Sequence, residues 1–171
     1  MDLSTRAKIF AIVFIILSGV LGYSSTIQLS PQDAQSLYLQ VKGITPTANG
    51  IFLNNLRVAL IEFIPLLGPA FGVYVSYSTG LALAAIAQAN PGAHVSGLES
   101  FLILLITPIY WMEFFSYSLA VEESIALVVS LRRRDFFEKK EWRWLLISLF
   151  LVVSVLFVSA RLEASLVALL G

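Results

Sequence analysis

The chain has 171 residues, of which 58% are hydrophobic and 13% are charged, and its formal net charge is zero. Its mean hydropathy of +0.85 excludes an ordinary soluble domain, because one core of this size could not bury so much apolar surface. We expect an all-α, polytopic integral membrane protein with one membrane domain over residues 1–171 and the lipid bilayer around it. The neutral charge balance gives no reason to expect a nucleic-acid partner.

Residues that usually build reactive sites are scarce. The sequence has no cysteine, which excludes disulfides, cysteine-ligated metals and thiol nucleophiles, and His94 is its one histidine. It contains no H-E-x-x-H motif, no phosphate-binding glycine loop and no histidine near a plausible serine nucleophile. We therefore expect no metal, no cofactor and no enzymatic activity.

The first apolar segment covers about residues 7–25 and follows Arg6 and Lys8. It is long enough to cross a bilayer, since about 20 helical residues span the hydrocarbon core. A basic start and an apolar run also occur in secretory signals, but no A-x-A cleavage site follows here, so we expect a retained signal-anchor helix. The polar residues 24–50 predict a loop with a short interfacial helix over 33–41.

The second apolar run, residues 51–88, is too long for one straight crossing. Pro65 and Pro69 interrupt it, and a proline removes a backbone donor and clashes with the preceding helical turn. The sequence thus predicts a short helix over about 51–64, either crossing or re-entrant, and a full span over about 69–89.

Small residues recur at every fourth position along the 69–89 span. Such a face lets the backbone of a neighbouring helix approach closely, so we expect a helix–helix interface there. The partner could lie in the same chain or in another subunit. The five residues are Gly68, Gly72, Ser76, Gly80 and Ala84.

The third part of the chain begins after a predicted tight loop around Pro91. Pro108 divides the apolar run 98–131 into a short half-helix and a longer helix, and a basic loop over 132–143 precedes a last span over about 144–170. About five membrane segments are therefore predicted. Because short loops rich in Lys and Arg stay in the cytoplasm, we expect a multi-pass protein of the cell membrane with its N-terminus inside and its C-terminus outside.

Polar side chains within the apolar runs form the candidate site. An intramembrane charge costs at least ~2.5 kcal/mol near the centre of a helix, which favours pairing, a wet cavity or a place near the interface. We expect Glu62 and Glu113 nearest the middle of the membrane, with Arg57 or Arg161 as counter-ions. A structural cluster, a proton or ion pathway and a docking site for a partner's charge all stay open. The predicted buried cluster comprises Asn54, Asn55, Arg57, Glu62, Glu113, Arg161 and Glu163.

Three stretches and the order of the apolar segments carry a resemblance to a known family. They are Asn54–Asn55 followed by Arg57, the segment 108–113, and the acidic segment 160–164. In this order and spacing they resemble the paired asparagines, the P-H-G-x-x-E signature and the terminal acidic segment of the stage II sporulation protein M family, which includes many archaeal membrane proteins. Ile109–Tyr110 replaces the signature's His-Gly pair, so the chain looks like a divergent branch and no role of that histidine carries over.

The resemblance implies a polytopic membrane protein, and the bacterial members are similar in acting as scaffolds of a cell-wall remodelling complex. With the short loops and the small-residue face, it favours a non-catalytic scaffold or accessory subunit whose partners are other membrane subunits or further copies of itself. The alternative is a small transporter or permease-like unit. In that case Glu62 and Glu113 would act beside the helix breaks at Pro65 and Pro108, because discontinuous helices often line substrate sites.

Overall fold

The computed structural model describes residues 1–42, 47–90, 92, 94–134 and 138–170, and in these ranges the chain forms seven helices and no strand. Four helices, α1, α4, α6 and α7, are long and apolar enough to cross a membrane. The prediction of a polytopic, all-α membrane fold is therefore confirmed. The helices are α1 (Leu3–Ser25), α2 (Pro31–Lys42), α3 (Ala48–Glu62), α4 (Leu67–Ala89), α5 (Gly97–Ile106), α6 (Pro108–Arg133) and α7 (Lys139–Leu170).

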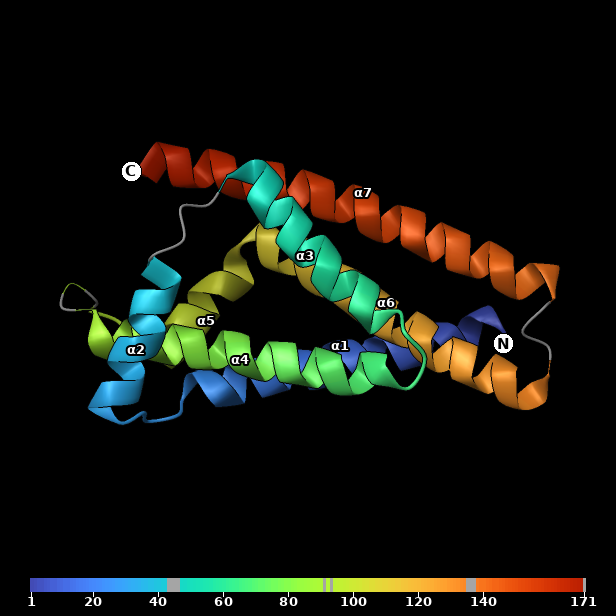
Figure 1. Cartoon of the computed structure of the whole chain (residues 1–171), viewed down its shortest axis with the longest axis horizontal. Helices are drawn as coiled ribbons and strands as arrows, with labels where there is room; N and C mark the ends of the chain where they lie inside the picture. The colour runs from blue at the N-terminus through green and yellow to red at the C-terminus, as the bar shows by residue number, and fades with distance from the viewer. Residues whose placement is uncertain (43–46, 91, 93, 135–137, 171) are drawn as a thin grey trace.

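The long helices run along the long axis of the molecule (Figure 1). The N-terminus, the turn between α3 and α4, the end of α6 and the start of α7 all lie at one end. We call this the basic end, because Arg132–Arg134, Lys139 and Lys140 are exposed there. The C-terminal part of α7, the α4–α5 connection and α2 lie toward the opposite end (Figure 1). Pro91, in the predicted tight loop, and residues 135–137 of the predicted basic loop lie outside the described residues.

Both predicted helix breaks occur. Helix α3 ends at Glu62 and α4 begins at Leu67, with Pro69 in the first turn of α4. Leu66, in the turn between them, has φ 70°, a left-handed conformation that costs energy for a side chain with a Cβ. Pro108 is the first residue of α6, where its missing N–H costs no helical hydrogen bond.

Helix α6 is the centre of the bundle, and most of its length is buried. It packs against α1, α3, α4, α5 and α7, while Trp111, Phe115 and Leu131 stay exposed. One apolar cluster joins it to α1 and α5 around Leu21 and Tyr110, and another joins it to α3 and α7 around Ala120 and Leu156. Helix α7 packs against α6 and α3 and leaves large apolar side chains exposed, as a lipid-facing helix would.

The small-residue face of α4 packs within the chain. All five of its residues are buried, and α4 lies against α1 along much of their length. A Cβ added to Gly80 would overlap Ser24 Oγ and the Leu21 carbonyl oxygen of α1, and one added to Gly68 would overlap the Glu62 carbonyl oxygen. The neighbours that fill this face are therefore helices of the same chain.

Gly80→Ala is expected to destabilise the protein by about 1–3 kcal/mol, because the new methyl group forces α1 away from α4. Gly19→Ala is the matched control, since a Cβ there meets nothing within 4 Å and alanine favours a helix over glycine by about 1 kcal/mol. Thermal unfolding in a mild detergent measures both. An equal melting temperature for the two variants would contradict the close packing.

Candidate functional site

Two groups of buried and half-buried polar side chains lie on α6, one near its start and one nearer the basic end. The arginine cluster consists of Arg6, Glu122, Glu123 and Glu141 with the Met1 ammonium. The carboxylate cluster consists of Asn55, Glu62, Glu113, Tyr117 and Glu163. The first joins α6 to α1 and α7, and the second joins it to α3 and α7.

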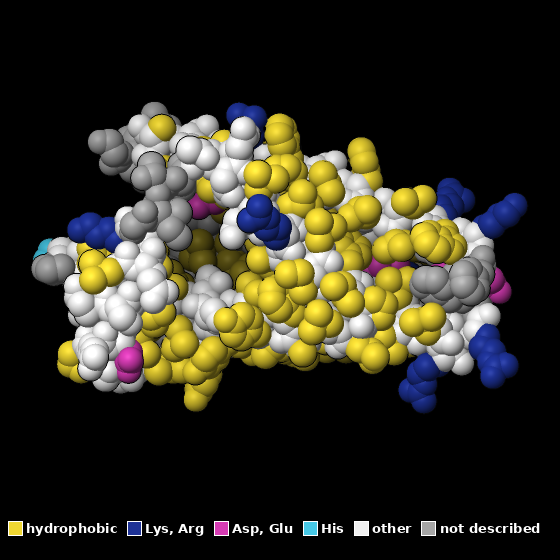
Figure 2. Space-filling view, viewed as in Figure 1, with side chains coloured by type: hydrophobic (Ala, Val, Ile, Leu, Met, Phe, Trp, Pro, Cys, Tyr) yellow, Lys and Arg dark blue, Asp and Glu magenta, His cyan; other side chains and the backbone are white. Residues whose placement is uncertain are grey.

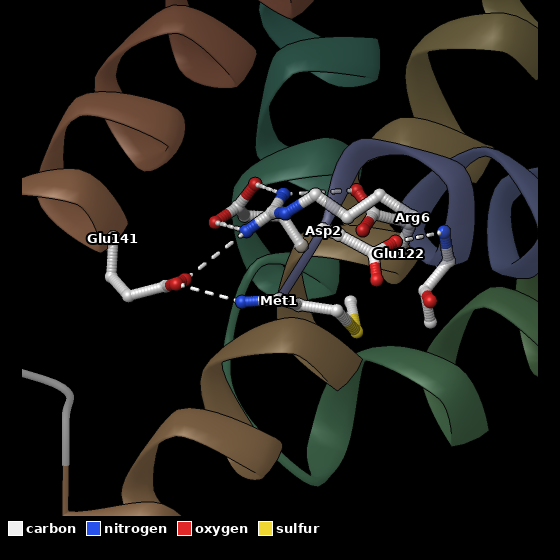
Figure 3. A network of polar contacts seen from close by, with 7 residues as sticks. Met1, Asp2, Arg6, Glu122 and Glu141 are labelled. Atoms are coloured by element: carbon white, nitrogen blue, oxygen red, sulfur yellow. Dashed lines mark hydrogen bonds and ion pairs between the residues drawn. The ribbon is translucent and has the colours of Figure 1, made fainter.

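The arginine cluster is centred on Arg6, which is 4% exposed although it lies in the first turns of α1. Its guanidinium donates two hydrogen bonds to Glu123, from Nη1 to Oε2 at 2.7 Å and from Nη2 to Oε1 at 3.3 Å. Nη1 also donates to Glu122 at 3.4 Å, and Nη2 to Glu141 at 3.4 Å. Figure 3 shows Arg6 reaching between Glu122 and Glu141. A bidentate interaction of this kind fixes the relative geometry of the arginine and the carboxylate.

Three further contacts involve residues of the arginine cluster. The Met1 ammonium lies 3.0 Å from Glu141 Oε1, and Ser148 Oγ donates to Glu123 Oε2 at 3.0 Å. The Arg6 guanidinium also lies 5.3 Å from the centre of the Trp144 ring, within the range of a cation–π contact. These bonds fasten the start of α7 and the start of α1 to the same stretch of α6.

Asp2 stands just before α1 and caps it, as Figure 3 shows beside the cluster. Its carboxylate accepts a hydrogen bond from the Thr5 backbone N–H at 2.7 Å. This bond stabilises the charged form and lowers the pKa of Asp2 below its ordinary value. Asp2 is exposed, so it belongs to the helix start and not to the buried cluster.

The carboxylate cluster lies farther from the basic end. Asn55 Nδ2 of α3 donates to Glu113 Oε1 of α6 at 2.6 Å. Glu163 of α7 interacts electrostatically with Glu113, and all three glutamates of the cluster act on Tyr117. Glu62 is 1% exposed, and its Oε2 has no hydrogen-bond partner among the described residues. Tyr117 thus lies within electrostatic range of carboxylates from three helices.

The predicted arginine counter-ions do not reach these carboxylates. Arg57 is exposed, and Arg161 is exposed with its guanidinium 5.2 Å from the Phe157 ring. Neither forms an ion pair with a described residue. The reason is helical geometry, since residues two apart point to different sides of a helix. Arg57 follows Asn55 by two positions, and Arg161 precedes Glu163 by two.

Asn54 also departs from the predicted cluster. It is exposed, and it contacts the cluster only by donating to Asn55 Oδ1 at 3.3 Å. The structure therefore brings together Asn55, Glu62, Glu113 and Glu163 of the seven predicted residues and adds Tyr117. Sequence reasoning missed Tyr117, although its place four residues after Glu113 puts it on the same side of α6.

The carboxylate cluster is suited to exchanging protons. An ionised carboxylate buried without a cation costs several kcal/mol, and Glu113 has Asn55 as a neutral donor. The neutral acid avoids that cost, so proton binding is the reversible chemistry open to these groups. Within the described ranges, no three His, Cys, Asp or Glu residues are placed to hold a metal ion.

Figure 2 shows a hollow on one face of the molecule, on the side of α3 away from the basic end. Acidic and basic side chains both lie near this hollow, and further lysines and arginines lie at the basic end (Figure 2).

Comparison of the chain with protein-family models, with curated proteins and with solved structures finds no match. The class of protein follows from the fold and the composition alone. Four long apolar helices, with charged groups buried between them, define a helical integral membrane protein.

Arg6→Gln is expected to destabilise the protein by about 3–5 kcal/mol, because it leaves buried carboxylates without their cation. Arg143→Gln, an exposed arginine at the same end, is the control and should change stability by less than about 0.5 kcal/mol. Thermal unfolding in mild detergent gives both values. Similar small effects would show that the arginine cluster does not hold α1, α6 and α7 together.

A hydrophobic carbodiimide is expected to label Glu113, because such reagents convert protonated carboxyl groups in apolar surroundings to stable acylureas. Mass spectrometry of the digested protein locates the adduct. Glu99 is the internal control, since it is exposed and accepts the Ser96 backbone N–H at 2.6 Å in a helix cap. Labelling of Glu99 in preference to Glu113 would show that Glu113 does not carry a proton.

Proposed function

We propose that this protein is a small proton-linked transporter of the cell membrane. The observation that carries the proposal is the carboxylate cluster, in which Glu62, Glu113 and Glu163 lie within electrostatic range of Tyr117 and have no ion-pair partner among the described residues. Ionisable groups at such a depth are costly, and membrane proteins use them in proton relays and substrate pathways.

Further hydroxyl side chains follow the cluster toward the basic end on the same side of α6. Glu113, Tyr117 and Ser124 occupy positions i, i+4 and i+11 of α6 and so share one side of the helix. Ser124 Oγ donates to the Ile64 carbonyl oxygen at 2.8 Å, at the end of the helix that carries Glu62. This row supports a route from the level of Asn55 to the turn between α3 and α4.

The broken helices support the same proposal. Glu62 is the last residue of α3, four residues before the left-handed Leu66, and Glu113 lies in the second turn after the break at Pro108. Breaks of this kind lie beside substrate and ion sites in many transporters, because the interrupted backbone supplies polar groups at membrane depth. The left-handed conformation at Leu66 costs of order 1–3 kcal/mol, which favours a second arrangement of the turn during transport.

The proposal includes an orientation and a family. Retention of short Lys- and Arg-rich loops would place the basic end in the cytoplasm and the end of α7 outside. The resemblance of residues 54–57, 108–113 and 160–164 supports divergent membership of the stage II sporulation protein M family.

A scaffold or accessory subunit is the second candidate function. The observation that favours it is α7, which packs against α6 and α3 and exposes Leu146, Phe150 and Phe157 to the outside. The small-residue face of α4 no longer supports this candidate, because helices of the same chain fill that face. The transporter explains the buried carboxylates, which a scaffold would not need.

Proteoliposomes with a pH-sensitive dye inside test the transporter. A potassium diffusion potential should drive proton uptake in the wild-type protein, and Glu113→Gln should slow it by about tenfold or more, because an amide cannot accept and release the proton. Glu99→Gln removes an exposed carboxylate and should leave the rate unchanged. Equal rates for wild type and Glu113→Gln would end the transporter proposal and leave the accessory subunit.

A further inference from the structure

One face of the first half of α7 carries basic side chains followed by apolar ones. Lys139 and Arg143 lie one helical turn apart on this helix. Leu146 and Phe150 follow at seven and eleven residues from Lys139, on the same side of the helix. We call this face the α7 strip. Its residues border one open depression and are all exposed; they are Lys139, Trp142, Arg143, Leu146, Ile147, Phe150 and Leu151.

The apolar part of the strip has the length of one leaflet of a membrane. Helix α7 forms one edge of the molecule (Figure 1), and Leu146 is 61% and Phe150 72% exposed there. Phe150 lies about 16 Å along the helix from Lys139, at about 1.5 Å per residue. One leaflet contributes about half of the hydrocarbon core of about 30 Å. An acyl chain beside the strip therefore reaches from the cations to the end of its own leaflet.

The two cations of the strip differ from the arginines at the end of α6. Arg132 and Arg133 lie in the last turn of α6, where the helix dipole stabilises a positive charge. Lys139 is the first residue of α7, where the dipole favours an anion. Neither Lys139 nor Arg143 forms an ion pair with a described residue. Glu141, the acid of the first turn, points inward to the arginine cluster. The charge of the strip is therefore left for an anion from outside the chain.

We propose that the α7 strip binds an anionic phospholipid of the surrounding membrane. The phosphate accepts hydrogen bonds from Lys139 and Arg143, and one acyl chain lies along Leu146 and Phe150. Trp142 borders the strip at the level of the head group, where tryptophan is common in membrane proteins. Clusters of basic residues beside a membrane span attract anionic head groups in this way. The binding does not depend on proton transport.

Charge and polarity together select this partner. A zwitterionic head group brings an ammonium as well as a phosphate, and among the described residues that border the strip no carboxylate receives it. Glu138, an exposed acid before α7, is not one of these residues. A soluble anion or a nucleic acid would meet the two cations but would leave Leu146 and Phe150 uncovered. An anionic phospholipid covers both parts of the strip.

Native mass spectrometry of the full-length protein in mild detergent tests the proposal by counting bound lipids. Phosphatidylglycerol and phosphatidylcholine with the same acyl chains are titrated separately. We expect the first phosphatidylglycerol to bind at least about tenfold more tightly, because each basic residue near a head group contributes a factor of about five. Equal affinities would overturn the proposal. Inorganic phosphate in excess should leave the lipid bound, and its complete displacement would overturn the proposal in favour of a soluble anion.

Two double substitutions with the same change of charge locate the site. Lys139→Gln/Arg143→Gln removes the cations of the strip and should bring the affinities for the two lipids to within about twofold of each other. Arg132→Gln/Arg133→Gln removes two exposed arginines from the same end of the molecule but none from the strip, and should keep the preference. An equal loss in both variants would show a general attraction by the basic end and overturn the proposal.

A single substitution keeps the test decisive if Lys139→Gln/Arg143→Gln does not fold. Arg143→Gln alone should lower the preference for phosphatidylglycerol by about fivefold, because one of the two cations that hold the phosphate is lost. Arg132→Gln is its matched control and should leave the preference unchanged. A wild-type preference in Arg143→Gln would overturn the proposal.

Discussion

The structure depends on the cost of burying glutamates on one central helix. Glu122 and Glu123 are at most 1% exposed on α6, and Glu113 lies in its second turn beside α3 and α7. Since Glu122 and Glu123 lie among packed helices, these two carboxylates have no water to face. Their compensation must come from neighbouring helices, which links the packing of α1, α3 and α7 to the charge on α6.

Proline and glycine made much of the fold predictable from the sequence. A proline limits the backbone by itself, so Pro65 and Pro108 indicated the breaks without knowledge of any neighbour. The four-residue spacing from Gly68 to Ala84 likewise indicates a face of one helix, and the structure buries all five of its residues. This spacing does not identify which helix packs on the face. The position of α1 in the structure shows that the neighbour belongs to the same chain.

Pairing of charges was harder to predict, because it depends on which side of each helix faces its neighbours. Asn55 and Glu113 meet across α3 and α6, while Arg57 and Arg161 point away from the carboxylates nearest to them in sequence. Arg6, in contrast, pairs with buried carboxylates although its place in the sequence does not predict this. It follows the usual pattern of a topology-setting basic residue before a span, yet its guanidinium turns inward to Glu123. The acidic pair Glu122–Glu123 lies within an apolar run, and this was the sequence feature that indicated a buried cation nearby.

The two clusters compensate the cost of placing carboxylates inside the bundle in different ways. At the basic end Arg6 forms ion pairs with Glu122, Glu123 and Glu141 and orients Glu123 through two hydrogen bonds. In the carboxylate cluster the hydrogen bond from Asn55 orients Glu113 without adding a charge, so the acid can gain or lose a proton while its neighbours stay in place. The arginine cluster therefore fixes helices to one another, and the carboxylate cluster is the part of α6 on which the proposed proton transport rests. The arginine cluster ties α1 and α7 to α6 at the basic end, and the break between α3 and α4 lies toward that same end.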